Sequence, residues 1–205
     1  MSHPTMRALS GAPAIRQLDA ARCALLVIDF QHEYFEGGRL FIPDGSAALG
    51  HALQLVRFAD SHRIPVFHVQ HLGAAGAALF PRDSERSAFH PELTPAPQHA
   101  VVQKTMASSF AGTDLHPQLQ ARGTETLIIC GLMTHMCVST TARDARPLGY
   151  RVLVAGDACA TRDIDGWDGA PVDHATLHRA ALTALADSFA EVLTTAGITA
   201  LPVQG

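Results

Sequence analysis

Short apolar runs recur along the chain, and each is closed by a polar residue or a glycine. Runs of this length that are rich in valine, isoleucine and leucine are typical of parallel strands buried on both faces of a sheet. We therefore predict strands at residues 23–29, 64–71, 99–104, 126–131, 150–156 and 190–195.

Helical patterns separate most of these strands. Apolar positions recur at helical spacing over residues 45–62 and 171–189. A further helix follows the fourth strand and should end near Arg146, because Pro147 and Gly149 come next. This alternation favours an α/β fold in which helices cover both faces of a doubly wound sheet.

We expect residues 1–205 to form a single three-layer α/β/α domain. Its sheet would hold six mainly parallel strands in the order 3-2-1-4-5-6, numbered along the chain. Residues 1–22 would form an N-terminal extension. Two turn-rich stretches, 72–98 and 160–171, lack periodicity, and such loops are functional in some proteins and plain exposed connections in others.

Composition narrows the range of partners and settings. Apolar residues make up 47% of the chain, and its net charge is −4 with no basic cluster, so we expect no nucleic-acid partner. No apolar run reaches the roughly 18 residues of a membrane span, and the first residues do not resemble a signal peptide. The four cysteines form no Cys-x-x-Cys pair. We therefore expect a cytoplasmic protein without a membrane partner.

Four residues capable of chemistry stand at or just beyond the ends of predicted strands. Asp29 closes the first strand, His71 the second and Lys104 the third, and Cys137 follows the fourth. Parallel strands bring their carboxyl ends to one edge of the sheet, where α/β proteins bind ligands. Strands one and four would be neighbours, whereas Lys104 would start about 10 Å from strand one and reach inward with its long side chain.

The setting of Cys137 favours a reactive thiol. Thr134 is a candidate N-cap, which would put Cys137 in the first turn of a helix. The free amides and the dipole there would lower the thiol pKa, as would a nearby lysine, and the same amides could bind an oxyanion. A buried cysteine that only fills the core is the alternative for this residue taken alone.

Three segments of the chain resemble those of the isochorismatase-like cysteine hydrolases. LLVIDFQHEYF carries Asp29 within an Asp-x-Gln element, QKTMASSFAGTDL carries Lys104, and GLMTHMCVSTTARDA carries Cys137. The resemblance runs from about residue 23 to 195. The family includes nicotinamidases, carbamoylsarcosine amidohydrolases, maleamate amidohydrolases and streptothricin hydrolases.

That resemblance implies a catalytic triad of Asp29, Lys104 and Cys137. It also implies a cis peptide bond between Leu132 and Met133, with the backbone amides of Met133 and Cys137 binding an oxyanion. Family members have a six-stranded parallel sheet and usually associate as dimers or tetramers. We therefore expect a homodimer or a homotetramer.

Nicotinamidases bind a metal through an Asp-x-His element after the second strand, and here that place reads HVQHLG. His68 and His71 are three residues apart on a strand, so they point to opposite faces and are badly placed to share an ion. We expect no metal and no cofactor.

Four residues near the predicted triad are candidates for binding a substrate, namely Gln31, Phe35, His71 and Phe110. Core packing is the alternative for the phenylalanines, and a buried, hydrogen-bonded ring is the alternative for His71. Trp167, the only tryptophan, could belong to a lid or could serve as a surface or interface residue.

The resulting hypothesis is a cofactor-free amidohydrolase that cleaves a C–N bond of a small amide through a thioester on Cys137. One alternative keeps the fold and hydrolyses a vinyl ether, as isochorismatases do, which would not need the thiol. Another is a non-catalytic binder of small molecules that senses oxidants through Cys137. A dinucleotide-binding domain is disfavoured, because no glycine-rich turn follows the first strand.

Overall fold

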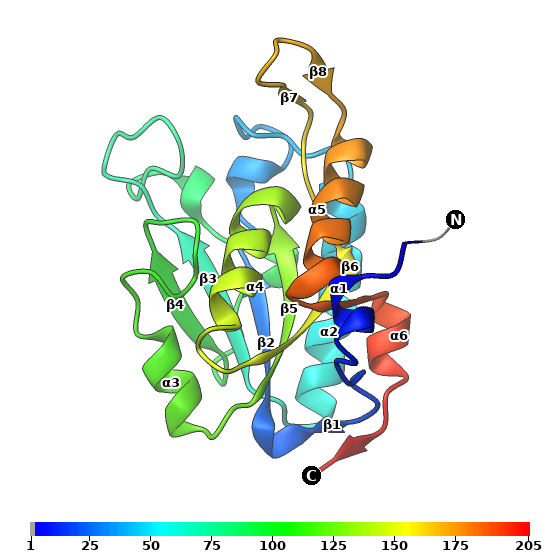
Figure 1. Ribbon diagram of the computed structural model, residues 1–205. Coiled ribbons are helices and arrows are strands. Elements are labelled where there is room, and N and C mark those ends of the chain that lie inside the picture. Colours follow the sequence, from blue (N-terminus) through cyan, green and yellow to red (C-terminus); the bar gives the residue numbers. More distant parts are fainter. Residues whose placement is uncertain (1–2) are drawn as a thin grey trace.

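The computed structural model describes residues 3–205 and contains one six-stranded parallel sheet (Figure 1). The strand order is β4-β3-β2-β5-β6-β9, which is the predicted order 3-2-1-4-5-6. The strands are β2 (Cys23–Ile28), β3 (Val66–His71), β4 (Ala100–Lys104), β5 (Thr126–Leu132), β6 (Arg151–Ala160) and β9 (Glu191–Leu193).

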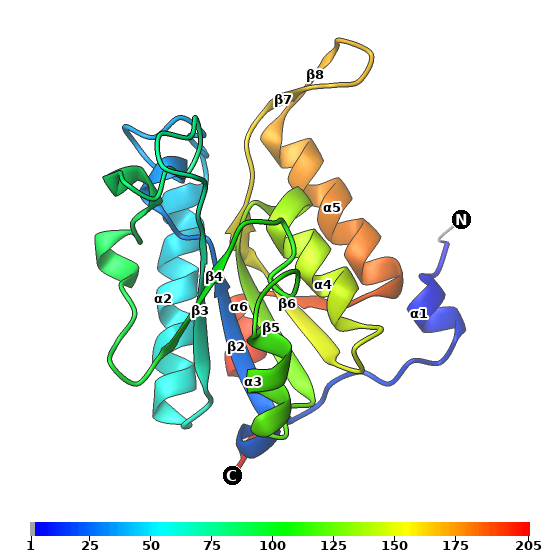
Figure 2. The same cartoon turned by 90° about the vertical axis from the view of Figure 1, so that its left-hand side faces the viewer.

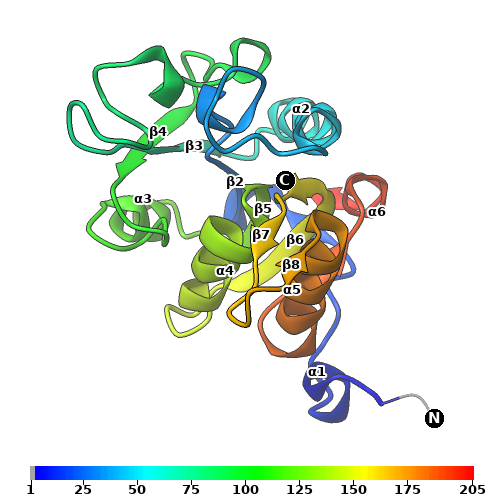
Figure 3. The same cartoon turned by 90° about the horizontal axis from the view of Figure 1, so that it is seen from above.

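Helices cover both faces of this sheet, as Figures 2 and 3 show. Helices α2 (Gly45–Ser61) and α6 (Thr195–Thr199) lie on one face. On the other lie α3 (Leu115–Ala121), α4 (Ser139–Ala145) and α5 (His174–Ser188). The predicted three layers are therefore confirmed.

The central strand β2 shows why a continuous apolar run suits this position. Its side chains alternate between the two faces, so that Leu25 and Val27 pack under α2 while Leu26 and Ile28 pack on the opposite side. Every residue of β2 is buried. A strand covered by helices on both faces needs apolar residues at every position.

The two ends of the described chain meet beside the sheet. Strand β1 (Leu18–Asp19) pairs in parallel with β10 (Val203–Gln204). The short helix α1 (Met6–Leu9) lies against α5, where the Met6 amide donates a hydrogen bond to Asp187 Oδ1. Residues 3–22 therefore run along the surface of the α/β body (Figure 1).

The two stretches without periodicity lie at the carboxyl end of the sheet. Residues 72–98 contain only short 3₁₀ turns at Glu85–Ser87 and Pro91–Leu93. The second stretch forms a hairpin of β7 (Ile164–Asp165) and β8 (Pro171–Val172), which projects beyond the body and carries Trp167 with its side chain fully exposed (Figure 1). Within residues 3–205, no helix is long and apolar enough to cross a membrane.

Candidate active site

Asp29, Lys104 and Cys137 meet at the carboxyl ends of β2, β4 and β5. Lys104 Nζ lies 2.8 Å from Asp29 Oδ2 and 3.2 Å from Cys137 Sγ. The ammonium group also lies 3.1 Å from His71 Nδ1 and 3.1 Å from the Met106 carbonyl oxygen. An ammonium has three N–H donors, so these four neighbours share three hydrogens. All three side chains of the cluster are buried.

Lys104 is the only lysine in the sequence, because the other basic residues counted with it are all arginines. It stands at the end of an edge strand, yet its side chain turns inward and is fully buried. A single lysine in a chain that otherwise uses arginine is a signal that sequence reasoning could have used. It indicates that this position needs a compact ammonium rather than a guanidinium.

The backbone turns sharply where β2 ends. Asp29 adopts φ of 55°, a left-handed conformation that is unusual for a residue other than glycine. Nearby, Gly131 has φ of 148°, and a Cβ there would lie 2.4 Å from the carbonyl oxygen of Ile28. Strands β2 and β5 thus approach closely just below the site, which brings the nucleophile loop beside Asp29.

The turn that carries Cys137 differs from our prediction. Residues Thr134–Val138 form a π-helical turn that leads into α4, and Met133 occupies the N-cap position. Thr134 is not the cap, because its hydroxyl is hydrogen-bonded to His178 Nδ1 at 2.8 Å. A wider π turn moves Cys137 relative to an ordinary α-helical first turn.

The loop that precedes this turn contains the cis peptide bond, between Leu132 and Met133. Met133 and Cys137, whose backbone amides we expect to bind an oxyanion, stand at the two ends of the segment that runs from this bond to the thiol.

The charge state of Cys137 also differs from our prediction. Burial raises the pKa of the Cys137 thiol, and the Asp29 carboxylate raises it further, while Lys104 lowers it. We expected a lowered thiol pKa from the helix terminus and the lysine, but desolvation and the adjacent carboxylate outweigh both. The resting cluster therefore holds a protonated thiol next to a carboxylate.

Lys104 keeps its charge in this setting. Burial by itself would lower the pKa of Lys104, but its interactions with Asp29 and with the Cys137 sulfur outweigh burial and raise that pKa. His71 responds in the opposite direction, since burial and the nearby Lys104 charge lower the pKa of its ring. The cluster thus contains an ammonium facing a neutral imidazole.

Gln31, which we predict to bind substrate, is buried and hydrogen-bonded to the backbone at the end of β3. Its side-chain nitrogen donates to the carbonyl oxygens of His71, at 2.8 Å, and of Ser87, at 2.6 Å, while its oxygen accepts from the His71 amide at 2.7 Å. Both N–H groups of the amide are thereby used. Gln31 fixes the end of β3 and so positions His71.

The two phenylalanines do not meet at the cluster either. The ring of Phe110 stacks on Tyr150, at 5.9 Å between centroids, and packs against the core cluster that also contains Cys137 and Tyr150. The Ser109 amide donates to Thr141 Oγ1, which fixes this turn. Phe35 is buried in the core against His90, at 4.4 Å between centroids. Of the predicted substrate-binding residues, His71 contacts the Lys104 ammonium through its ring, and the backbone amide of Gln31 donates to the Asp29 carbonyl oxygen at 2.9 Å.

Sequence reasoning missed Glu33, a fully buried carboxylate. It accepts hydrogen bonds from the amides of Arg39 and Phe80, both at 3.0 Å, and pairs with Arg86 at 3.3 Å. The ring of Phe80 in turn packs on His71 at 4.9 Å between centroids. The partners Phe80 and Arg86 of Glu33 are distant from it in sequence, so the local sequence pattern did not indicate a role for Glu33.

Tyr34 was missed as well. Its side chain is buried, and burial together with the electrostatic influence of Asp29 and Cys137 raises the pKa of the phenol, whereas Arg162 lowers it. The ring of Tyr34 packs edge-on against Phe80, at 5.2 Å between centroids. The sequence around Tyr34 did not indicate that this tyrosine is buried near the cluster.

The residues of a nicotinamidase-type metal site do not come together here. His68 Nε2 faces His99 Nδ1 at 3.1 Å, whereas His71 Nδ1 faces Lys104. The two histidines thus lie on opposite sides of β3, as predicted from their spacing. We therefore derive no catalytic step through a metal.

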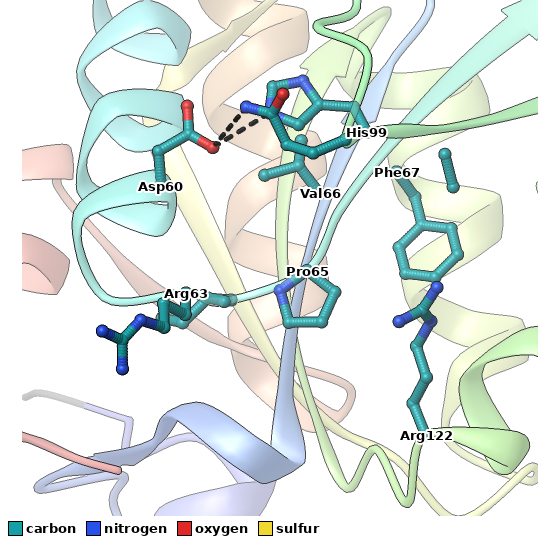
Figure 4. A pocket seen from close by; sticks show the side chains of 10 residues that line it. Asp60, Arg63, Pro65, Val66, Phe67, His99 and Arg122 are labelled. Atoms are coloured by element: carbon teal, nitrogen blue, oxygen red, sulfur yellow. Dashed lines mark hydrogen bonds and ion pairs between the residues drawn. The ribbon is translucent and has the colours of Figure 1, made fainter.

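The sheet carries a separate cavity of about 350 Å³ at the amino ends of β3 and β4, shown in Figure 4. Asp60 and His99 line it and are joined by a hydrogen bond of 3.0 Å, and Arg63 and Arg122 lie at its margins. Because it opens at the end of the sheet opposite Cys137, it does not contribute to the cluster.

Comparisons with known proteins identify the family to which the chain belongs. The protein-family model described as isochorismatase domain matches residues 23–197 of this chain. The isochorismatase family protein YddQ of Bacillus subtilis is 37% identical over 174 residues, covering 84% of this chain and 96% of that protein. A streptothricin hydrolase of Streptomyces noursei is 35% identical over 189 residues, covering 90% of this chain and 73% of the hydrolase.

A solved structure extends the comparison to the fold. The crystal structure of an isochorismatase from Pseudomonas putida superposes with a TM-score of 0.89 at 35% identity, covering 96% of this chain and 99% of that one. The fold, the matched domain and the cluster at the strand ends lead to the same assignment. The chain belongs to the isochorismatase family of hydrolases.

Proposed function

We propose that this protein is an amidohydrolase that cleaves a C–N bond of a small-molecule amide through a thioester on Cys137. The observation that carries the proposal is the buried ammonium of Lys104, 2.8 Å from Asp29 Oδ2 and 3.2 Å from Cys137 Sγ. A thiol, a carboxylate and a fixed positive charge are the parts that nucleophilic catalysis at a carbonyl requires. Kinship with a streptothricin hydrolase supports the same class of reaction.

In the first half of the reaction, Cys137 Sγ attacks the carbonyl carbon of the amide while its proton moves to Asp29. Because the raised pKa keeps the thiol protonated at rest, proton transfer accompanies the attack. The negative charge that develops on the carbonyl oxygen accepts hydrogen bonds from the backbone amides of Met133 and Cys137. Asp29 then protonates the departing nitrogen as the C–N bond breaks.

In the second half, water attacks the thioester carbon and gives its proton to Asp29. The C–S bond breaks, and the proton on Asp29 returns to the sulfur of Cys137. Lys104 stays charged throughout and stabilises first the carboxylate and then the sulfur as it leaves. The cycle yields a carboxylic acid and an amine and restores the starting protonation states.

His71 gives this site a defined polar contact for the substrate. Its Nδ1 accepts a hydrogen bond from the Lys104 ammonium, so the neutral ring carries its proton on Nε2. That N–H group can donate to an oxygen of a bound molecule. We therefore assign His71 to substrate binding, whereas Gln31 serves to position it.

A hydrolysis screen tests the proposal, with ammonia release followed for primary amides and ureides and the mass gain of one water followed for lactams. Cys137→Ala is the inactive partner and Cys159→Ala the matched control. We expect hydrolysis by the wild type and by Cys159→Ala, together with an acyl adduct on Cys137 in intact-mass measurements. Cleavage of a vinyl ether by both the wild type and Cys137→Ala, without cleavage of any amide, would contradict it.

A further inference from the structure

One ligand atom from each of Asp29, His71 and Cys137 lies within 4.8 Å of the others. A carboxylate oxygen, an imidazole nitrogen and a cysteine sulfur form a donor set that suits zinc and similar ions better than magnesium or calcium. Within residues 3–205, no other group of three such residues comes so close together.

The Lys104 ammonium occupies the centre of this donor set. It lies 2.8 Å from Asp29 Oδ2, 3.1 Å from His71 Nδ1 and 3.2 Å from Cys137 Sγ. Its three nearest polar side-chain atoms are therefore those that a metal ion would use. The cluster already holds a cation, and that cation belongs to a side chain with a flexible four-carbon stem.

We propose that Asp29, His71 and Cys137 form an inhibitory site for a borderline-soft divalent ion such as Zn²⁺, in which the metal displaces the Lys104 ammonium. The site differs from the nicotinamidase type, since it uses neither His68 nor an Asp-x-His element.

The geometry needs only a modest change. Tetrahedral zinc with bonds of about 2.0–2.3 Å holds its ligand atoms about 3.5 Å apart, so the three side chains must close in by roughly 1 Å. Cys137 binds as the thiolate, and its thiol proton leaves to solvent. The sulfur, nitrogen and oxygen each donate an electron pair to the ion, and no group is oxidised or reduced. Lys104 moves outward with its charge.

Two consequences separate this site from casual metal binding. Because Lys104 competes with the ion for the same atoms, Lys104→Met should bind the metal more tightly than the wild type does. Because His71 supplies a ligand, His71→Ala should bind it more weakly. A merely adventitious surface site would respond to neither substitution.

Co²⁺ is a suitable probe, because its bond to a thiolate gives a charge-transfer absorption in the near ultraviolet. We would titrate chelator-treated protein with Co²⁺, count bound ions by equilibrium dialysis, and displace them with Zn²⁺. We expect one ion per chain with the thiolate band, affinity at least tenfold higher in Lys104→Met, and affinity at least tenfold lower in His71→Ala. Circular dichroism would verify that each variant is folded.

Two control variants remove metal-binding groups that lie outside the cluster. His174→Gln removes the exposed cluster in which His174 lies 2.7 Å from Asp163 and 3.4 Å from Asp44, the strongest competing surface site. Cys159→Ala removes a buried thiol outside the cluster. Both should retain the band, and Cys137→Ala should lose it.

Absence of the band in both the wild type and Lys104→Met would overturn the proposal. So would a band that survives in Cys137→Ala, or equal affinity in wild type and Lys104→Met. Metal binding rests on the cluster alone, whereas inhibition rests on the proposed hydrolysis. The spectroscopic readout therefore distinguishes failure of one from failure of the other.

Discussion

At the scale of single residues, the cluster behaves as one unit rather than as three separate contributors. Lys104 contacts both Asp29 and Cys137, and its interaction with each of these two raises the pKa of Lys104. Residues coupled in this way give strongly non-additive losses when they are substituted.

We predict that Cys137→Ala abolishes amide hydrolysis and that Asp29→Asn is nearly as severe, with a loss of at least about 1,000-fold in kcat. The first removes the nucleophile, and the second removes the proton acceptor while preserving shape. The double variant should be scarcely worse than either single one. Steady-state rates on an identified amide measure this.

The outcome that contradicts the prediction is full activity in Cys137→Ala. It would show that the thiol is not the nucleophile and would favour vinyl ether hydrolysis. Thermal unfolding of each variant serves as the control that the fold persists.

Lys104 should affect the reactivity of the Cys137 thiol. Lys104 lowers the pKa of the Cys137 thiol, against the effects of burial and Asp29. Lys104→Ala should therefore raise the thiol pKa further and slow its alkylation by iodoacetamide at neutral pH. Burial raises the pKa of Cys23 and of Cys159 to about 12, so these thiols should stay slow in both proteins. Faster alkylation of Cys137 in Lys104→Ala would argue against this electrostatic role.

At the scale of elements, the close approach of β2 and β5 depends on one glycine. A Cβ at Gly131 would lie 2.4 Å from the Ile28 carbonyl oxygen, and its φ of 148° is strained for other residues. We predict that Gly131→Ala lowers the free energy of unfolding by at least about 2 kcal/mol. Urea denaturation measures it.

The matched variant is Gly50→Ala, in the middle of α2. A Cβ there meets no atom within 4 Å, and alanine is the better helix former. The free energy of unfolding of Gly50→Ala should therefore exceed that of the wild type by about 0.5–1 kcal/mol. If Gly131→Ala and Gly50→Ala changed the free energy of unfolding alike, β2 and β5 would be shown to move apart easily.

The turn at residues 134–138, which carries Cys137, was only partly predictable from the sequence. The apolar run that ends in Gly131 predicts the end of β5 and the position of Cys137 beyond it. The role of Thr134 was not predictable, because its hydroxyl bonds to His178 of α5, which is distant in sequence. Gln31 and Glu33 likewise owe their hydrogen-bond partners to loops far away in sequence.

At the scale of the whole molecule, sequence patterns predicted the six strands, their order and the helical layers, since burial on both faces leaves a clear apolar signature. They did not predict β1 and β10, whose two-residue pairing carries no periodicity. The convergence of Asp29, Lys104 and Cys137 was predictable because parallel strands bring their ends to one edge. The pKa of the thiol was not, because it depends on how deeply those residues are buried.

Overall stability should depend on pH through His68. Burial and the neighbouring His99 lower the pKa of His68 to about 4, while Asp60 opposes them. The unfolded state, with its pKa near 6.5, takes up the proton first, so stability should fall as pH drops from about 6.5 to 4. The loss attributable to this residue is up to about 3 kcal/mol.

Chemical denaturation at several pH values, compared between the wild type and His68→Gln, isolates this effect from that of other groups. The variant should lose less stability on acidification. Equal slopes in the two proteins would assign the acid sensitivity to other residues.

We also predict that the protein is a homodimer or homotetramer. Only 17% of its residues are charged, and Trp167 on the projecting hairpin is fully exposed. Large exposed apolar side chains indicate partner contacts when they occur together with low surface charge. A monomeric mass by light scattering at micromolar concentration would refute the prediction.

The single lysine has a practical consequence for proteolysis. An endoproteinase that cuts only after lysine has one site in this chain, between Lys104 and Thr105, and the lysine side chain there is fully buried. Digestion can therefore proceed only when β4 detaches its end from the cluster. The rate at which the chain is cut into residues 1–104 and 105–205 thus reports how often the site opens, and a ligand that closes the site should slow it.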